Sequence, residues 1–190
     1  MKLKTVLLGA ALVGVTLIAS SHPVQAQVCP KGEVVPPSEQ TRIIRSDSLN
    51  YRFNIPRNYR TMLFRGNVLI YDPATFAQAQ CYVKNRVPSE LPRGVSVYVK
   101  SVNPGSRNVT DLVKQQFGVE ILESTTVANQ SAILYNSDTL GGWKNISFLT
   151  PDRRHMITIA VPYQYSGGKW VTSSLLEEVF KTIVSSFTFV

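Results

Sequence analysis

The C-terminal end of the chain carries the pattern that most constrains its fold. Between positions 175 and 184 apolar residues recur with helical spacing, while Glu178 and Lys181 fall on the other side of the helix. Ser174 followed by Glu177 predicts a capping box at the start of this helix. An apolar face this wide has to be buried, and in a chain with many strand-like segments the surface available is a β-sheet. The stripe consists of Leu175, Leu176, Val179, Phe180, Ile183 and Val184.

Strand-like segments recur along the rest of the chain. They show alternating or continuous apolar character and are bounded by Pro, Gly, Asn or Asp. Short linkers at Gly141-Gly142 and Pro151-Asp152 join the last three segments, which predicts an antiparallel meander. The expected strands span residues 51–55, 67–71, 95–100, 131–136, 143–149 and 155–161.

A second helix is expected after the turn at Asn103-Pro104-Gly105. Asn108 is a suitable N-cap, and Gly118 weakens the C-terminal half. The element order is then β-β-β-α-β-β-β-α. We therefore expect an α+β fold, in which a mainly antiparallel sheet is packed by two helices in a manner similar to an α/β/α sandwich. The apolar face of this second helix would consist of Leu112, Val113, Phe117 and Ile121.

The first 26 residues have the features of a cleavable export signal. Lys2 and Lys4 precede an apolar run at positions 6–18, and Val24-Gln25-Ala26 places small residues ahead of a cut before Gln27. The alternative is an uncleaved N-terminal anchor. Removal of 26 of the 190 residues leaves 164, enough for one domain. We expect an exported protein of the periplasm, the thylakoid lumen or the extracellular space, without a transmembrane segment after cleavage.

Residues 27–50 are predicted to form an extended N-terminal arm ahead of a single domain at residues 51–190. The arm lacks hydrophobic periodicity and is rich in turn-forming residues. It contains Cys29, and the other cysteine is Cys81. Two cysteines in an exported chain favour a disulfide, which would fasten the arm to the domain, although two free thiols are the alternative. The turn-forming residues are Pro30, Gly32, Pro36 and Pro37.

This order of elements resembles a known family. Tyr51-Arg52-Phe53-Asn54-Ile55-Pro56 forms a strand ending in proline, an aromatic turn follows at Tyr59, and Asp72-Pro73 closes the next strand. A Val-rich strand, a helix, a meander and a closing helix then lead into Ser185-Ser186-Phe187-Thr188-Phe189. Over residues 51–190 the chain looks like the PsbP-like proteins, extrinsic lumenal proteins of photosystem II, and the wider Mog-type α/β/α sandwich. The resemblance implies a non-enzymatic accessory or assembly role at a membrane surface, and it carries over no site residues.

Arginines are concentrated near the start of the expected domain. Six of them lie between positions 42 and 65, against one acid, Asp47. Without residues 1–26 the chain has 18 basic and 12 acidic residues, a charge of +6. A positive field favours an anionic partner, either an acidic protein face or an anionic membrane surface, although a basic surface can also serve solubility alone. Nucleic acid is not expected. The candidate binding arginines are Arg52, Arg57, Arg60 and Arg65.

A second group of candidate binding residues is aromatic. Trp170 follows Gly167-Gly168-Lys169, and Tyr163 and Tyr165 lie just before it. Aromatic rings held beside a loop can stack on sugar rings, so these residues could make a carbohydrate or cell-wall binding domain. The alternative is that the rings cover the core, as aromatic residues commonly do.

The sequence offers little for catalysis. His155 is the one histidine after residue 26, and the nearest acid, Asp152, lies with it in a predicted hairpin turn, where we expect both to be structural. An extracytoplasmic hydrolase that uses His155 or a pair of acids stays as an alternative. The chain contains no Gly-x-Ser-x-Gly elbow, phosphate-binding loop or calcium loop, and it lacks the three or four N/S ligands of a zinc site. No catalytic residue, metal site or cofactor is predicted.

Overall fold

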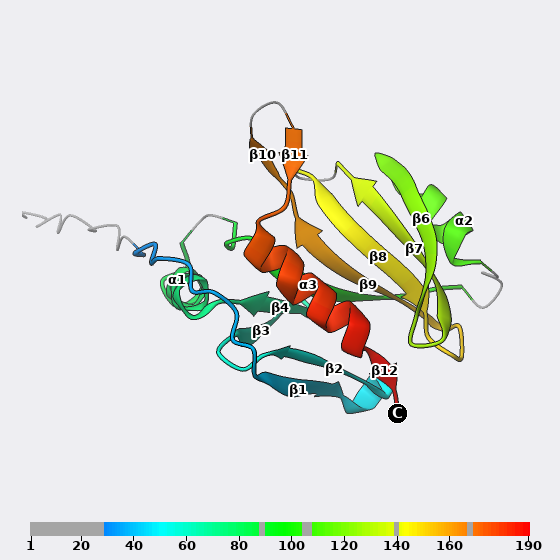
Figure 1. Cartoon of the computed structure of the whole chain (residues 1–190), viewed down its shortest axis with the longest axis horizontal. Helices are drawn as coiled ribbons and strands as arrows, with labels where there is room; N and C mark the ends of the chain where they lie inside the picture. Colours follow the sequence, from blue (N-terminus) through cyan, green and yellow to red (C-terminus); the bar gives the residue numbers. More distant parts are fainter. Residues whose placement is uncertain (1–28, 88–89, 104–107, 139–140, 167–168) are drawn as a thin grey trace, which may run out of the picture.

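A computed structural model describes residues 29–87, 90–103, 108–138, 141–166 and 169–190. The predicted signal peptide and the expected turns at Pro104-Gly105 and Gly167-Gly168 lie outside the described residues. The largest sheet is antiparallel, with seven strands in the order β3-β4-β5-β9-β8-β7-β6 (Figure 1). In chain order these strands are β3 Arg60–Phe64, β4 Asn67–Tyr71, β5 Val95–Ser101, β6 Val119–Val127, β7 Gln130–Ser137, β8 Trp143–Leu149 and β9 His155–Pro162.

A second antiparallel sheet has the order β1-β2-β12. β1 (Thr41–Ser46) is joined to β2 (Tyr51–Pro56) by the short 3-10 helix η1 (Asp47–Leu49), and the C-terminal strand β12 (Thr188–Phe189) pairs with β2. Residues 41–46 of the predicted extended arm thus form a strand of this sheet, which the sequence analysis did not predict. β1 is an edge strand whose alternate residues are exposed, so it lacks the apolar run by which a buried strand is recognised. β10 (Gln164–Ser166) and β11 (Lys169–Val171) form a separate hairpin.

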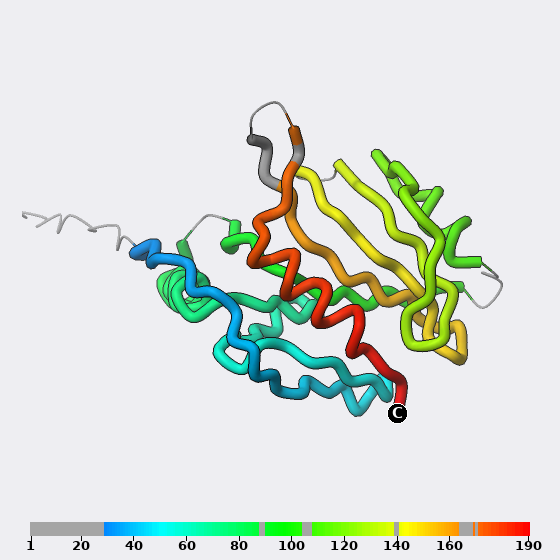
Figure 2. The backbone as a smooth tube through the Cα atoms, in the orientation of Figure 1, coloured from blue at the N-terminus to red at the C-terminus, as the bar shows by residue number. Residues whose placement is uncertain are grey.

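Helix α3 (Ser174–Ser186) lies between the two sheets, with β2 on one side and β9 and β5 on the other (Figures 1 and 2). Its apolar stripe is buried as predicted, with Val179 and Ile183 fully inaccessible. The predicted capping box is wrong, because the N-cap is Ser173 and its side chain makes no capping hydrogen bond. The Glu177 carboxylate instead pairs with Lys144 of β8.

Aromatic rings at the C-terminal end of α3 join the two sheets. The Phe187 ring centroid lies 5.8 Å from that of Phe53 in β2 and 5.0 Å from that of Phe148 in β8. Ring pairs at these separations add to the stabilisation from apolar burial. The terminal Phe187-Thr188-Phe189 segment therefore belongs to the main hydrophobic core.

Two further helices lie at opposite ends of the large sheet (Figure 1): α1 (Pro73–Lys84) contacts β3 and β4, while α2 (Val109–Lys114) contacts β7 and β8. The fold is the predicted α+β class with mainly antiparallel sheets, but the described residues form three α-helices where two were expected. α1 was missed because it has no wide apolar stripe, and Ala79 is its one fully buried residue. None of the helices in the described ranges has the length and apolar character needed to span a bilayer.

α2 is shorter than predicted. Asn108 caps it as expected, with its side-chain oxygen accepting a hydrogen bond from the Thr110 amide. The helix ends at Lys114, and Gly118 has a φ of +65°, in the left-handed region that favours glycine. Phe117, expected on the buried face, is 87% exposed, and the chain from Val119 onward pairs with β7. Pairing along a whole strand prevails over the weak helical periodicity of this segment.

The predicted disulfide is confirmed. Cys29 is bonded to Cys81 in α1, with their Cα atoms 5.7 Å apart. The segment after Cys29 is also held by hydrogen bonds: the Val35 amide donates to Asp72 Oδ1, and Asn58 Nδ2 donates to the Pro36 carbonyl. This part of the chain is therefore attached to the domain along its length.

Candidate functional site

The face of the seven-stranded sheet turned away from α3 contains a groove. α1 packs at the β3–β4 end of this face and α2 at the β7–β8 end, and the groove between them has a volume of about 620 Å³. This is in the range of sites that hold small molecules. Its lining is mainly apolar and aromatic and includes Phe64, Leu69, Tyr71, Tyr98, Tyr135 and Trp143.

The floor of the groove carries buried polar groups. Tyr135 Oη lies 3.1 Å from Ser147 Oγ, which lies 2.6 Å from Thr158 Oγ1, so three hydroxyls form one chain of hydrogen bonds. Burial raises the pKa of the Tyr98 hydroxyl, and the neighbouring Ser96 hydroxyl partly opposes this rise. Ser96 itself is fully buried. A sheet face that only packed against helices would have no need of these groups.

Arg93 forms part of the rim, just before β5. Its Nη1 donates to the Gly141 carbonyl at 2.7 Å, and its guanidinium lies 5.1 Å from the centroid of the Trp143 ring. Gly141 has a φ of +99°, and a Cβ at this position would overlap the Arg93 guanidinium. The backbone conformation thus favours glycine, and any side chain here would also displace the Arg93 guanidinium.

The arginines of the N-terminal region are partly brought together. Arg45 of β1 lies directly opposite Arg52 of β2, and both are exposed. Arg42 donates to the Tyr59 carbonyl through Nε and Nη2; burial lowers the pKa of its guanidinium, and the nearby charge of Arg60 adds to this effect. We call this group the arginine surface; it comprises Arg42, Arg45, Arg52, Arg57 and Arg60.

The arginine surface has no acidic partner of its own in the described part of the chain. Arg57 Nη1 donates to Gln40 Oε1 at 3.0 Å, and Arg52 Nε donates to Thr188 Oγ1 at 3.2 Å, but neither bond neutralises the charge. Arg65, also a predicted binding residue, lies apart from this surface, in the turn after β3 with its guanidinium 5.2 Å from the Phe64 ring centroid.

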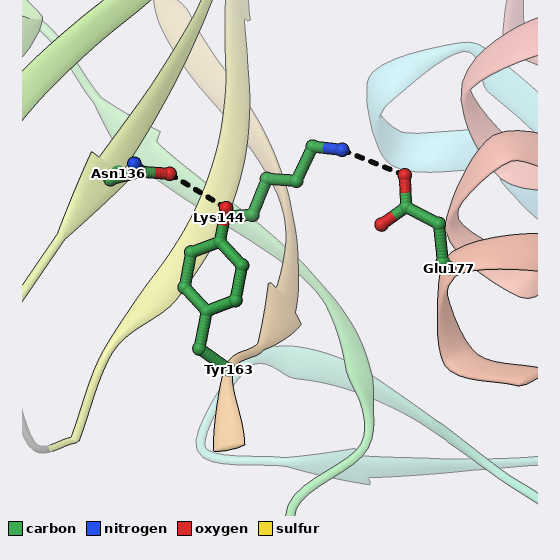
Figure 3. A network of polar contacts seen from close by, with 4 residues as sticks. All are labelled: Asn136, Lys144, Tyr163 and Glu177. Carbon is green, nitrogen blue, oxygen red and sulfur yellow. Dashed lines mark hydrogen bonds and ion pairs between the residues drawn. The ribbon is translucent and has the colours of Figure 1, made fainter. Parts of the chain in front are cut away.

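The predicted aromatic group is only partly described. Tyr165 and Trp170 are cross-strand partners in the β10–β11 hairpin, but their side chains lie outside the described residues. The Tyr163 hydroxyl donates to Asn136 Oδ1 at 2.8 Å, close to the Lys144–Glu177 ion pair (Figure 3). Burial raises the pKa of this hydroxyl, with smaller contributions from the charges of Glu177 and Glu120. Tyr163 is thus half-buried and held in place by β7.

His155 and Asp152 lie in and beside the turn between β8 and β9, where the sequence placed them. His155 is the first residue of β9, and Asp152 Oδ1 accepts hydrogen bonds from Thr150 Oγ1 at 2.6 Å and from the Arg154 amide. These bonds, that from Thr150 first, lower the pKa of the Asp152 carboxyl. Both residues therefore belong to the turn between β8 and β9. Among the described residues no cluster of three His, Cys, Asp or Glu side chains could hold a metal ion.

Comparison with known proteins gives limited similarity. No family model and no curated protein matches the chain. A Bacteroides thetaiotaomicron crystal structure aligns with 80% of this chain at 8% identity and a TM-score of 0.46, and the chain spans about half (49%) of that protein's length. The solution structure of cyanobacterial PsbP (CyanoP) from Synechocystis aligns with 87% of this chain and 99% of its own, at 16% identity and a TM-score of 0.44. Both TM-scores lie below 0.5, so neither similarity identifies a family or a function.

No pattern in the sequence predicted the groove. Its residues come from β3, β4, β5, β7, β8 and β9 and from the loop before β5, so they meet only once the sheet is assembled. One signal was present: Asn145, Ser147 and Thr158 are polar residues inside strands that otherwise read as buried. Their positions on one face of β8 and β9 indicate a surface that helices do not fully cover.

Proposed function

We propose that this chain is a non-enzymatic extracytoplasmic accessory domain that docks onto the acidic face of a membrane protein through its arginine surface. The observation that carries the proposal is the arrangement of Arg45 and Arg52. They are direct cross-strand neighbours, and like charges in this relation destabilise a sheet. A partner carboxylate between them would remove the repulsion and accept charge-assisted hydrogen bonds.

The rest of the arginine surface supports the same partner chemistry. Among the described residues the one ion pair is Lys144–Glu177, on another part of the molecule, so these guanidinium groups have no carboxylate of their own. Guanidinium groups match the planar, two-oxygen geometry of carboxylates. The outer side of β1 and β2 also exposes a single large apolar residue, Ile43, at 53%, which fits a polar protein contact better than insertion into lipid.

The disulfide supports an extracytoplasmic location for the protein. Disulfides form and persist in oxidising environments such as the periplasm, and are rare in the cytoplasm. The Cys29–Cys81 bridge thus agrees with the export signal expected from residues 1–26.

The test is retention of the purified protein on washed membranes of its source organism at increasing salt. Exposed charges are screened beyond about 8 Å at physiological ionic strength and beyond about 3 Å at 1 M. We expect strong retention at low salt and release at 1 M salt. Retention that does not change with salt would refute docking through the arginine surface.

A matched pair of triple variants tests whether the arginine surface makes the contact with the membrane. The triple variant Arg45→Gln, Arg52→Gln, Arg57→Gln should lose retention, whereas Lys114→Gln, Arg153→Gln, Arg154→Gln, which removes the same charge from exposed positions elsewhere, should keep it. Equal losses would mean that net charge alone drives binding. Equal retention on protein-free vesicles made from the extracted lipids would overturn the protein partner and assign the surface to anionic lipid.

A further inference from the structure

We propose that the groove on the open face of the seven-stranded sheet binds a small aromatic carboxylate, with its acid group on Arg93 and its ring along the groove. This inference does not depend on the arginine surface, none of whose residues lines the groove. The groove has a volume of about 620 Å³, which is suited to one small molecule and too small for a folded partner.

Arg93 supplies a fixed cation. Its contacts with the Gly141 carbonyl and the Trp143 ring hold the guanidinium at the rim, and its hydrogen bonds to described residues, to Gly141 and Tyr163, all use Nη1. An arginine has five N–H donors, so Nε and Nη2 keep donors that no described residue accepts. A guanidinium held in this way loses little freedom on binding a carboxylate, and the pairing can be bidentate.

The ring of the ligand is indicated by the aromatic lining. Tyr71 and Tyr135 are buried in the floor, while Phe64, Tyr98 and Trp143 remain half-exposed and present ring surface to the groove. Planar rings stack well on such surfaces, in offset or edge-to-face arrangements. An aliphatic ligand could cover the same apolar surface, but it would not gain from the stacking geometry that aromatic rings prefer.

The charged groups of the groove fit a ligand with a single carboxylate better than a ligand with several negative charges. Lys100 also lines the groove, but lies near the far end of β5 from Arg93, and Glu90 lies on the Arg93 side. A multiply charged anion would therefore meet Glu90 as well as Arg93. Ser96 and Tyr98 lie on the same face of β5, and Ser96 is fully buried beside the Tyr98 ring that lines the groove.

The test compares 2-naphthoate with 2-naphthamide, which has the same shape and no charge, by isothermal titration calorimetry. We expect naphthoate to bind about tenfold or more tightly than naphthamide, since a charge-assisted bidentate pair contributes at least that factor. In Arg93→Gln the two ligands should bind equally. Lys181→Gln, which removes an exposed charge from α3 on the opposite side of the sheet, should behave as the unmodified protein.

A second readout does not depend on the stability of the Arg93 variant. In Trp170→Phe the one remaining tryptophan is Trp143, so its indole N–H gives a single resonance in a nitrogen–proton NMR spectrum. Naphthoate should shift that resonance in a saturable way. No binding of naphthoate, equal binding of naphthamide, or binding that leaves Trp143 unshifted would each overturn the proposal.

Discussion

At the residue scale, Lys144 and Glu177 make the ion pair that links the large sheet to α3. Lys144 Nζ lies 2.7 Å from Glu177 Oε1, and the two side chains are only 22% and 19% exposed. The ammonium also lies 5.6 Å from the Phe180 ring centroid. Removing one partner would leave the other charge half-buried without compensation, which costs more than the pair itself contributes.

We predict that Glu177→Gln lowers the free energy of unfolding by about 1.5–3 kcal/mol, the range for a hydrogen bond to a charged group. The neighbouring Glu178→Gln is the control, because Glu178 is exposed and is not in this ion pair, and it should change stability by less than about 0.5 kcal/mol. Urea unfolding at neutral pH measures both. Equal effects for the two variants would show that the pair adds nothing.

The ionisation of Tyr59 should make the stability of the fold depend on pH in the alkaline range. It is buried, its hydroxyl donates to the Val35 carbonyl, and burial together with the charges of Asp72 and Glu178 raises its pKa to about 12. Burial also raises the pKa of Tyr71 to about 12. In the unfolded chain a tyrosine ionises near pH 10, so above that pH the unfolded state loses protons that the folded state retains.

The contribution of these protonated tyrosines is therefore complete below about pH 10 and is lost as the pH rises toward 12. We predict a fall in stability across this interval that is smaller in Tyr59→Phe than in the unmodified protein, since phenylalanine cannot ionise. Denaturant unfolding at a series of pH values, with tyrosinate absorbance followed in parallel, measures it. A pH dependence identical in the variant would mean that Tyr59 ionises normally in the folded state.

At the element scale, the sequence predicted the strands whose pattern is local and missed the elements that depend on partners. The meander β7–β9 and helix α3 could be predicted because their apolar residues recur with a clear period. β1 could not, since it has exposed alternate residues and is defined by its pairing with β2. The groove could not be predicted either, because its lining comes from strands that are distant in sequence.

Helix α1 shows that a start signal can be more informative than periodicity. Asp72 and Pro73 are an N-cap residue and a residue favoured at the first helical position. Asp72 is 4% exposed, and its Oδ1 accepts hydrogen bonds from the amides of Ala74 and Thr75 and from that of Val35. The cap thus fixes both the start of the helix and the N-terminal segment.

We predict that Asp72→Ala lowers the free energy of unfolding by about 2 kcal/mol, because three partly buried amides lose their acceptor. Asp72→Asn, which keeps an acceptor oxygen, should retain most of the stability. Asp47→Ala is the control, since Asp47 is exposed in η1. Thermal unfolding by circular dichroism compares the three. A loss in Asp72→Ala no larger than in Asp47→Ala would show that the cap is unimportant.

At the scale of the whole molecule, the disulfide closes a loop of 52 residues that contains the arginine surface and the first four strands. In the chain-entropy model such a bridge restricts the unfolded chain and stabilises the fold by roughly 4 kcal/mol. The folded N-terminal segment has its own attachments, in which the Ser38 amide donates to Asn58 Oδ1 at 2.9 Å and Asn58 Nδ2 donates to the Pro36 carbonyl at 2.8 Å.

Because hydrogen bonds also hold the N-terminal segment, removing the disulfide can lower the global stability without releasing this segment from the folded domain. We predict that Cys29→Ser combined with Cys81→Ser lowers the free energy of unfolding by several kcal/mol, up to roughly 4 kcal/mol, while the Ser38 amide keeps its protection from hydrogen exchange under native conditions. The entropic account acts on the unfolded chain, so the native contacts of Asn58 should persist. If the Ser38 amide instead exchanges freely while the global stability is unchanged, the bridge holds the segment in place and does little for the fold as a whole.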